Sequence, residues 1–310
     1  MKKLDKIVSK HLGKAGDGSI VKPYVTPDKA DSSLLVPVPR VLNREEYGID
    51  EDDLQFLGFD SWNCYEVSFL LENGFPISGV VKIVYPSDSE FIVESKSLKL
   101  YMNSYNMHKI GNNITSGIAE VTSQIIADLS DALGCNVDVT FHYDDDIDLP
   151  EKAVKGHFTR LESLIDLDTI EFNNYEEDPE ILEHAPMLGF MPFQITSSAL
   201  RSNCRITNQP DWGDVFIHIQ GEDCVTPESL MRYIISMRKE NHFHEEICEC
   251  IYTRLKDLLA DDTEILVACL YTRRGGIDIN PVRASSLKLL DELVPGLIDS
   301  DIPHRKTPRQ

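Results

Sequence analysis

Hydrophobic and polar positions along the chain predict the same order of elements twice. In the first half, alternating apolar and polar residues indicate strands, the pair Asn73-Gly74 indicates a hairpin, and a run of apolar residues at helical spacing ends at Gly134. The elements expected there are strands at residues 65–72, 77–85, 136–143 and between 156 and 172, and helices at 95–105 and 114–132. Their order is strand, strand, helix, helix, strand, strand.

The second half shows that order again. Thr226-Pro227 marks a helix start, and Gly275-Gly276 marks a turn between two strands. The elements expected are strands at 204–206, 215–220, 263–272 and 277–284, and helices at 227–238 and 244–260. One offset of 132 residues aligns Ser97, Leu98 and Tyr101 with Ser229, Leu230 and Tyr233, which predicts a duplicated α+β unit.

These elements divide the chain into five segments. A chain of 310 residues with 42% hydrophobic content is long enough for two domains with cores of their own. The expected segments are an N-terminal arm at 1–40 with an apolar patch at 34–38, a first module at 41–175, a linker at 176–203, a second module at 204–295 and a tail at 296–310.

Charge narrows the range of partners. The formal net charge is −22, and such a surface repels phosphate backbones and anionic lipid headgroups. No apolar run approaches the roughly 18 residues that a membrane span needs. The seven cysteines form no C-x-x-C pair and the N-terminal segment has no apolar signal region, which indicates reduced thiols. We therefore expect a cytoplasmic protein without a nucleic-acid or membrane partner.

The main candidate for chemistry is Cys204, within the stretch L-R-S-N-C-R-I-T-N-Q-P-D-W-G. A cysteine is nucleophilic as the thiolate, and the nearby Arg201 and Arg205 would favour that form. The alternative is a structural cysteine at the beginning of a strand.

Asp211 follows seven residues later and is a candidate for moving protons. Pro210 and Gly213 predict a turn that would hold its carboxylate toward the sulfur. In the alternative interpretation, Asp211 only caps that turn.

Two further patches are suited to phosphate. In E-S-K-S-L-K-L-Y, residues 94–101, hydroxyls and lysines lie at a helix start, where backbone N–H groups favour an anion. Arginines and glycines in residues 271–283 would let backbone and guanidinium approach a phosphate. The alternative for residues 94–101 is an ordinary exposed basic turn.

The fourth patch, N-H-F-H-E at residues 241–245, also opens a helix. The helix dipole keeps Glu245 ionised, so that it can accept hydrogen bonds from an N–H edge, and Phe243 could stack on a flat ring. The alternative is a capping carboxylate with a packing aromatic.

A metal site would compete for some of these residues. His244 and Cys248 are four residues apart on one helix face and, with Cys204, offer three zinc ligands. A zinc site of this kind would give Asp211 and the two arginines near Cys204 no role, so we expect no metal. The acidic residues 144–148 lack the glycine and spacing of a calcium loop and indicate a solvated turn.

Together, the four motifs resemble the NADPH-dependent 7-cyano-7-deazaguanine reductases of queuosine biosynthesis, in their long two-module form. The motifs S-N-C-R-I-T-N-Q-P-D-W-G, E-S-K-S-L-K-L-Y, F-H-E and R-R-G-G-I-D-I-N-P occur in the family's order, and the resemblance covers residues 65–283. It implies an α+β tunnelling fold with two tandem modules, each a four-stranded antiparallel sheet with two helices. It also implies a homodimer.

The resemblance implies a role for each matching residue. Cys204 resembles the nucleophile that forms a covalent thioimide with the nitrile, and Asp211 resembles the general acid and base. The implied substrate pocket comprises Val93, Glu94, Ser95, Phe243, His244 and Glu245, and the implied NADPH contacts are Ser95, Lys96, Arg274 and Gly275. Two NADPH molecules would take the nitrile to the amine.

Other functions remain open at this point. Relatives that form an amidine on tRNA keep the cysteine and acid but lack the E-S-K-S motif, which this chain has. A non-catalytic tunnelling-fold module would bind a purine-like ligand and leave Cys204 unreactive. Cys248 or Cys250 would be a partner for Cys204 in a disulfide formed on oxidation.

Overall fold

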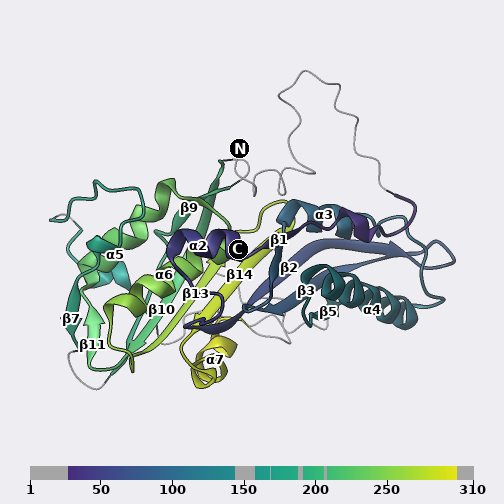
Figure 1. Cartoon of the computed structure of the whole chain (residues 1–310). Helices are drawn as coiled ribbons and strands as arrows, with labels where there is room; N and C mark the ends of the chain where they lie inside the picture. Colours follow the sequence, from purple (N-terminus) through teal and green to yellow (C-terminus); the bar gives the residue numbers. More distant parts are fainter. Residues whose placement is uncertain (1–26, 144–157, 168, 188–190, 206–207, 299–310) are drawn as a thin grey trace. The chain divides into compact units, whose positions relative to one another are not determined.

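The computed structural model describes residues 27–143, 158–167, 169–187, 191–205 and 208–298. The described chain forms two units that alternate along the sequence (Figure 1). Unit 1 contains 27–43, 61–143 and 274–278, and unit 2 contains 44–60, the described residues between 158 and 273, and 279–298. Helices and mainly antiparallel strands make a mixed α+β fold, as expected.

The sheet of unit 1 is built on β2 (Leu57–Leu70), β3 (Pro76–Pro86) and β5 (Asp138–His142). The hairpin between β2 and β3 turns at Gly74, whose φ of 87° suits glycine, and this confirms the turn predicted there. β2 begins eight residues before the predicted strand. Its first half contains the buried polar residues Asp60, Ser61 and Asn63, so the alternation that marks a half-buried strand is absent.

The two longer helices described in unit 1 are α3 (Ser95–Asn103) and α4 (Ile114–Leu133). Both were predicted from the sequence, and α4 was predicted from helical spacing. The buried face of α4 includes Val121, Ile125 and Leu129, and the helix ends at Gly134 with φ 66°.

The N-terminal apolar patch lies along a neighbouring strand. β1 (Pro37–Pro39) pairs antiparallel with β4 (Phe91–Val93), and Val38 is fully buried. Residues 37–39 therefore lie along another segment of unit 1.

In unit 2, β10 (Pro210–Gln220) pairs antiparallel with both β8 (Phe193–Ser197) and β13 (Glu264–Tyr271). β14 (Ile277–Ala284) pairs with β13. Alternate residues of β13 enter two hydrophobic clusters, Ile265, Val267, Cys269 and Tyr271 in one and Leu266, Ala268 and Leu270 in the other. Burial on both faces explains why this strand is a continuous apolar run.

The predicted helices of unit 2 are present as α5 (Pro227–Ser236) and α6 (His244–Leu258). The Thr226 side chain caps α5 by accepting a hydrogen bond from the Ser229 amide. Among the described residues of both units, the other helices are short: α2 (Val41–Tyr47), α7 (Leu287–Leu293) and the 3-10 turns η2 (Ser32–Leu34), η3 (Leu161–Ser163), η4 (Pro179–Ile181), η5 (Met237–Lys239) and η6 (Val294–Gly296).

The predicted repeat appears as equivalent hydrogen bonds in the two units. Ser97 and Ser229 donate to the carbonyl of their helix N-cap residue, at 2.7 and 3.1 Å. Each also accepts an amide from the residue before a short strand, β1 or β7 (His184–Pro186), at 3.1 and 3.0 Å. Tyr101 and Tyr233 are both fully buried. The 132-residue offset therefore aligns residues with the same local environment.

Residues 156–203 differ from expectation. The strand predicted between 156 and 172 is the two-residue β6 (Thr159–Arg160), which lies in unit 2 and pairs in parallel with β8. The expected linker carries β7, β8 and most of β9 (Arg201–Cys204), and β7 pairs with β11 (Asp223–Val225). These strands are two to five residues long, too short for a clear periodic signal. The module boundaries stay a prediction.

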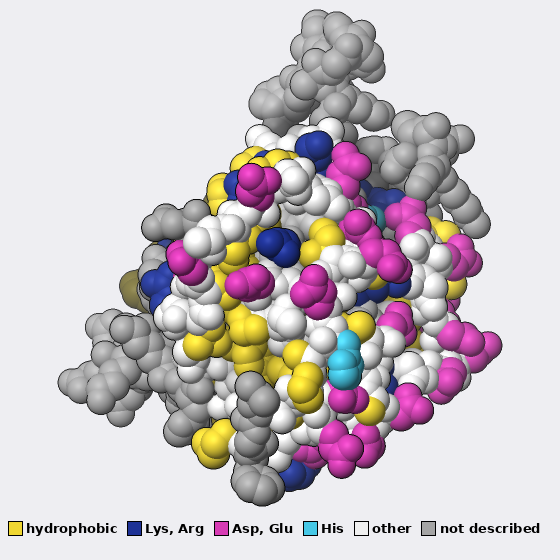
Figure 2. All heavy atoms as spheres, turned by 90° about the vertical axis from the view of Figure 1, so that its left-hand side faces the viewer, with side chains coloured by type: hydrophobic (Ala, Val, Ile, Leu, Met, Phe, Trp, Pro, Cys, Tyr) yellow, Lys and Arg dark blue, Asp and Glu magenta, His cyan; other side chains and the backbone are white. Residues whose placement is uncertain are grey.

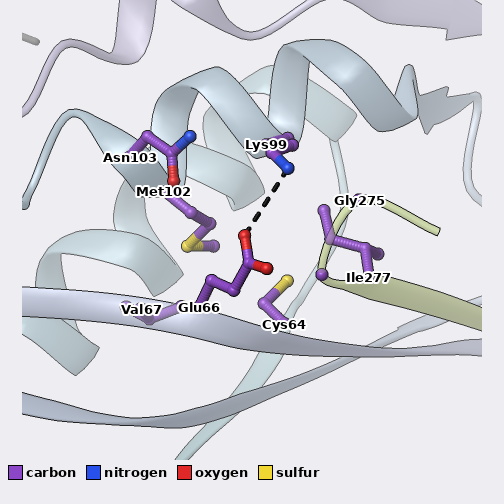
Figure 3. A pocket seen from close by; sticks show the side chains of 9 residues that line it. Cys64, Glu66, Val67, Lys99, Met102, Asn103, Gly275 and Ile277 are labelled. Atoms are coloured by element: carbon purple, nitrogen blue, oxygen red, sulfur yellow. Dashed lines mark ion pairs between the residues drawn. The ribbon is translucent and has the colours of Figure 1, made fainter. Parts of the chain in front are cut away.

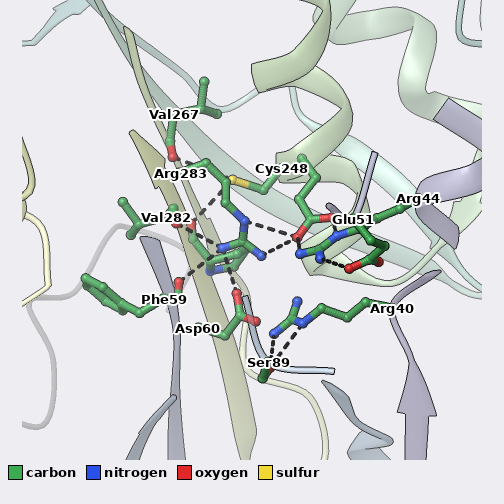
Figure 4. A network of polar contacts seen from close by, with 12 residues as sticks. Arg40, Arg44, Glu51, Phe59, Asp60, Ser89, Cys248, Val267, Val282 and Arg283 are labelled. Carbon is green, nitrogen blue, oxygen red and sulfur yellow. Dashed lines mark hydrogen bonds and ion pairs between the residues drawn. The ribbon is translucent and has the colours of Figure 1, made fainter. Parts of the chain in front are cut away.

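A buried ion network joins several elements of unit 2 (Figure 4). Glu249 of α6 accepts a bidentate pair of hydrogen bonds from Arg44, at 2.9 and 2.8 Å, and another at 2.8 Å from Arg283 of β14. Arg283 also donates to Asp60 at 2.9 Å, and both guanidinium groups lie 5.5 Å from the ring centroid of Phe56. Each buried charge therefore has a partner of opposite sign.

Removing Glu249 should be costly because it would leave two arginines buried beside one fewer carboxylate. We expect Glu249→Ala to lower the free energy of unfolding by about 3–5 kcal/mol. Asp257→Ala on the same helix removes an exposed carboxylate and should cost less than about 1 kcal/mol. Urea denaturation of both variants checks this, and equal losses would contradict it.

Candidate active site

Cys204 lies at the end of β9, which forms an antiparallel pair with the beginning of β10. Asp211 is directly opposite Ser202. Because successive side chains of a strand point to opposite faces, Ser202, Cys204 and Asp211 share one face of this pair. Asp211 is buried and Cys204 is half-buried.

The predicted turn around Asp211 is wrong. The residue belongs to β10, which begins at Pro210, five residues before the strand expected from the sequence. Proline is tolerated at the first position of a strand, so it marks the strand's start here. The sheet, and not a turn, therefore orients the Asp211 carboxylate.

A second motif reaches the same place through strand pairing. β12 (Asn241–His242) pairs in parallel with β9 and sets His242 opposite Cys204. The chain then enters α6 at His244, whose Nε2 lies 3.3 Å from Oδ2 of Asp211. The cysteine motif and N-H-F-H-E therefore lie together in unit 2, as one candidate site.

The His244 ring is also held from its flat side. It stacks on Tyr271 with ring centroids 3.8 Å apart and planes 8° apart. Tyr271 is opposite Gly213, where an added methyl group would lie 3.2 Å from the tyrosine ring. Sequence reasoning missed this role of Tyr271, and the glycine opposite it was the available signal. Burial raises the pKa of the Tyr271 hydroxyl well above its ordinary value, so the hydroxyl stays neutral.

The two arginines near Cys204 have different partners. Arg201 donates to the carbonyl oxygen of Arg238 and its guanidinium lies 6.0 Å from the ring centroid of Trp212. Arg205 lies 3.5 Å from a carboxylate oxygen of Glu246. The carboxylate offsets part of the positive charge that Arg205 would otherwise direct at the thiol.

His242 lies in a charge cluster that the sequence analysis missed. Its Nδ1 is 2.8 Å from Glu246 and its Nε2 is 3.2 Å from Glu240. Burial opposes the charged ring, but the hydrogen bonds to Glu240 and Glu246 outweigh it and raise the pKa of His242 to about 9. The three acidic residues in E-N-H-F-H-E-E were the sequence signal for this cluster.

The rest of the N-H-F-H-E motif lies at the start of α6, as predicted. Phe243 is the N-cap residue, half-buried, and its amide donates to Glu246 at 3.2 Å. Glu245 is buried in the first turn of the helix.

In unit 1, Glu94 caps α3 immediately after Val93 ends β4. Its carboxylate accepts hydrogen bonds from the amides of Lys96 and Ser97, at 3.1 and 2.7 Å. The Ser95 hydroxyl lies 3.5 Å from the same carboxylate. Burial raises the pKa of Glu94, although both amide hydrogen bonds oppose that shift.

The other predicted cofactor residues form a tight turn in unit 1. Arg274 and Ile277 exchange backbone hydrogen bonds of 2.8 and 3.2 Å around Gly275 and Gly276. Both glycines have positive φ, 58° and 83°, as a two-residue hairpin turn of type I′ requires. Lys99 of α3 lies over this turn, so the structure brings α3 and the glycine turn together (Figure 3).

The zinc alternative has no ligand set in the described chain. Among the described residues, no three His, Cys, Asp or Glu side chains are placed to hold a metal ion. Cys248 is fully buried, with its sulfur 3.5 Å from the carbonyl oxygen of Val267. The acidic residues 144–148 lie outside the described residues.

Cys248 and Cys250 are poor partners for a regulatory disulfide. Both are fully buried, and burial raises the pKa of each thiol above its ordinary value. An oxidant or a second sulfur would need access to a thiolate. Their environment argues against the disulfide with Cys204 that the sequence suggested.

Comparison with known proteins identifies the class. The family model described as "Nitrile reductase, 7-cyano-7-deazaguanine-reductase N-term" matches residues 26–141, and the one described as "QueF-like protein" matches residues 210–288. The chain is therefore an enzyme of the nitrile reductase class.

Three relatives of known name show which family the chain belongs to. The chain is 39% identical over 260 residues to the NADPH-dependent 7-cyano-7-deazaguanine reductase of Chromobacterium violaceum, covering 83% of this chain and 88% of that protein. The proteins of the same name from Colwellia psychrerythraea and Rickettsia massiliae are 37% and 38% identical, each over 83% of this chain and over 87% and 89% of their own lengths. The chain belongs to the family of NADPH-dependent 7-cyano-7-deazaguanine reductases, as its motifs indicated.

The His242 cluster should make stability depend on pH. The folded-state pKa of about 9 exceeds the ordinary value of 6.5, so the stabilisation is complete below pH 6.5 and is lost as pH rises through about 9. We expect His242→Gln to remove a contribution of up to about 3 kcal/mol at pH 6 and little at pH 10.

Urea denaturation between pH 6 and 10 measures this difference. His184→Gln is the matched control: this half-exposed histidine of the same unit lies 2.9 Å from Asp223, and an exposed pair contributes at most about 1 kcal/mol, so the loss should be clearly smaller than for His242→Gln. If His242→Gln and the parent keep the same difference at every pH, the charged bridge does not stabilise the fold.

Proposed function

We propose that this chain reduces 7-cyano-7-deazaguanine to 7-aminomethyl-7-deazaguanine with two NADPH, through a covalent thioimide on Cys204, in queuosine biosynthesis. This proposal is supported by one observation: in a chain of this family, Cys204, Asp211 and His244 lie close together at the β9–β10 pair.

The chemistry follows from the groups at the site. A nitrile accepts a hydride poorly until a nucleophile has added to its carbon. The Cys204 sulfur bonds to that carbon, one π bond of the nitrile breaks, and the nitrogen takes a proton, for which Asp211 is the donor. Each NADPH supplies one hydride, so the nitrile needs two to become an amine. After the first hydride had added to the thioimide carbon, the nitrogen lone pair would form a carbon–nitrogen double bond as the carbon–sulfur bond breaks. The Cys204 thiolate would then take back a proton, and the second hydride would reduce the resulting imine to the amine.

His244 orients the acid. Its ring stacks on Tyr271 and its Nε2 lies 3.3 Å from the Asp211 carboxylate, so the histidine restricts how that carboxylate can turn. A histidine beside the acid also offers a route by which the carboxylate regains a proton between the two reductions.

Substrate recognition is assigned to groups at two helix starts. Glu245 would accept hydrogen bonds from the N–H edge of the deazaguanine, and Phe243 would pack on its ring. Glu94, with Val93 and Ser95, would serve the same substrate from unit 1. We infer that the assembly is a homodimer, the form expected from the family resemblance.

The cofactor contacts are assigned to Ser95, Lys96, Arg274 and Gly275. They lie on α3 and on the glycine turn, which meet in unit 1. Lysine, arginine and a glycine backbone suit the phosphates of NADPH.

Charge supports a free base as substrate, and not a tRNA. The net charge is −22, and acidic side chains are spread over the face shown in Figure 2. Such a surface repels a polyanion at long range. No helix among the described residues has the length and apolarity of a membrane span.

The thioimide can be tested without cofactor, because sulfur addition consumes no hydride. Mixing the protein with 7-cyano-7-deazaguanine alone should add the whole substrate mass to Cys204, detected by intact mass spectrometry and peptide mapping. Cys204→Ala should give no adduct and no NADPH oxidation. Cys135→Ala, at another half-buried cysteine, should keep both.

Each alternative function gives a different result in this experiment. A non-catalytic binding module would bind the nitrile without an adduct. The amidine-forming reaction would proceed through an adduct without consuming NADPH. Adduct formation together with nitrile-dependent NADPH oxidation is expected only of the reductase.

Asp211→Asn keeps the shape of the side chain but cannot transfer a proton. We expect it to slow nitrile-dependent NADPH oxidation by roughly 10²–10⁴-fold, the usual loss for a general acid. Asp214→Asn changes a buried aspartate of the same strand and serves as the matched control. A rate for Asp211→Asn within a factor of three of the parent would remove this residue from the mechanism.

A further inference from the structure

A small pocket in unit 1 lies where β2, α3 and the glycine turn meet (Figure 3). Glu66 of β2 and Lys99 of α3 face each other across it, with Nζ and Oε2 3.5 Å apart. Both side chains reach solvent, at 37% exposure for Lys99 and 63% for Glu66. An anionic ligand therefore has access to this lysine.

The glycine turn is shaped around this ion pair. A methyl group at Gly275 would lie 3.2 Å from Nζ of Lys99, and one at Gly276 would lie 2.5 Å from the carboxylate carbon of Glu66. Larger residues at these positions would push the pair away, in addition to the strain of a positive φ. The glycines let both charged groups lie close to the backbone of the turn.

The surroundings of Glu66 are suited to an anion. Lys99 is one helical turn from Lys96, and the turn that carries Gly275 begins at Arg274. The Glu66 carboxylate thus occupies the position beside Lys99 that an anionic oxygen of a ligand would take.

This internal contact is weak enough to be exchanged. Exposed ion pairs contribute about 0–1 kcal/mol because water and salt screen them. A phosphate brings more charge and three acceptor oxygens, and hydrogen bonds between charged groups are stronger than neutral ones. A phosphate can therefore displace the Glu66 side chain, which has space to turn outward.

We propose that Glu66 is a displaceable competitor for the phosphate site formed by Lys99 and the Gly275 turn. In the free chain its carboxylate neutralises Lys99, and a phosphate group of the cofactor replaces it on binding. The proposal rests on the proposed use of NADPH. It makes Glu66 a specificity residue, because a ligand without a phosphate gains too little from Lys99 to displace the carboxylate.

The test measures NADPH binding by fluorescence in the absence of nitrile, so it does not depend on turnover. Glu66→Gln keeps the size of the side chain and removes the competing charge. We expect the Kd for NADPH to fall by about two- to fivefold. Glu120→Gln, an exposed carboxylate on α4 of the same unit, is the matched control and should leave the Kd unchanged.

A double-variant cycle separates local competition from a general charge effect. In the Lys99→Met background the site has lost its cation, so adding Glu66→Gln should change the Kd by less than about 1.5-fold. An equal improvement with and without Lys99, or an unchanged or weaker Kd in Glu66→Gln alone, would overturn the proposal.

NADH distinguishes the two phosphate sources. If the 2′-phosphate displaces Glu66, the substitution should improve binding of NADPH and not of NADH. If the pyrophosphate does so, both should improve alike, and either result supports the exchange. A parent protein that binds NADPH but forms no nitrile adduct would refute the proposed reaction while leaving this inference standing.

Discussion

The buried carboxylate of Glu249 is the constraint on which the arrangement of unit 2 depends. It lies between Arg44 and Arg283, and three charges removed from water are tolerable only because their hydrogen bonds are complete. Glu249 is in α6, so the same contacts fix the helix whose first residues are His244 and Glu245. The polar network therefore sets where α6 begins, and this helix could not shift along its axis without separating buried charges.

Strand pairing brings the other residues of the candidate active site together. β9, β10 and β12 bring segments from 201 to 242 into register beside one cysteine, and β13 presents Tyr271 beneath His244. In unit 1, α3 and the glycine turn meet in an equally local way. The residues assigned to chemistry and those assigned to the cofactor thus belong to different units, and each set is organised by contacts within its own unit.

The sequence predicted most where periodicity is strong. α4, α6 and β13 followed from hydrophobic spacing, and the offset between Ser97 and Ser229 correctly aligned equivalent positions. It failed where long-range contacts override local signals. The beginning of β2 buries polar groups that find partners far along the chain, as Asn63 does with Asp278. Likewise, the position of His242 opposite Cys204 could not be predicted without the pairing of β12 with β9.

The equivalent positions of the two units supply an internal reference for what folding requires. At equivalent helix caps, unit 2 has the neutral hydroxyl of Thr226 and unit 1 has the carboxylate of Glu94. Threonine satisfies the helix end without burying a charge, so a neutral cap is enough for this architecture. Glu94 is buried, so its charged form loses hydration free energy that the neutral Thr226 does not lose. Of the two equivalent caps, the one in unit 1 therefore carries an acid that folding alone does not demand, at the cost of some stability.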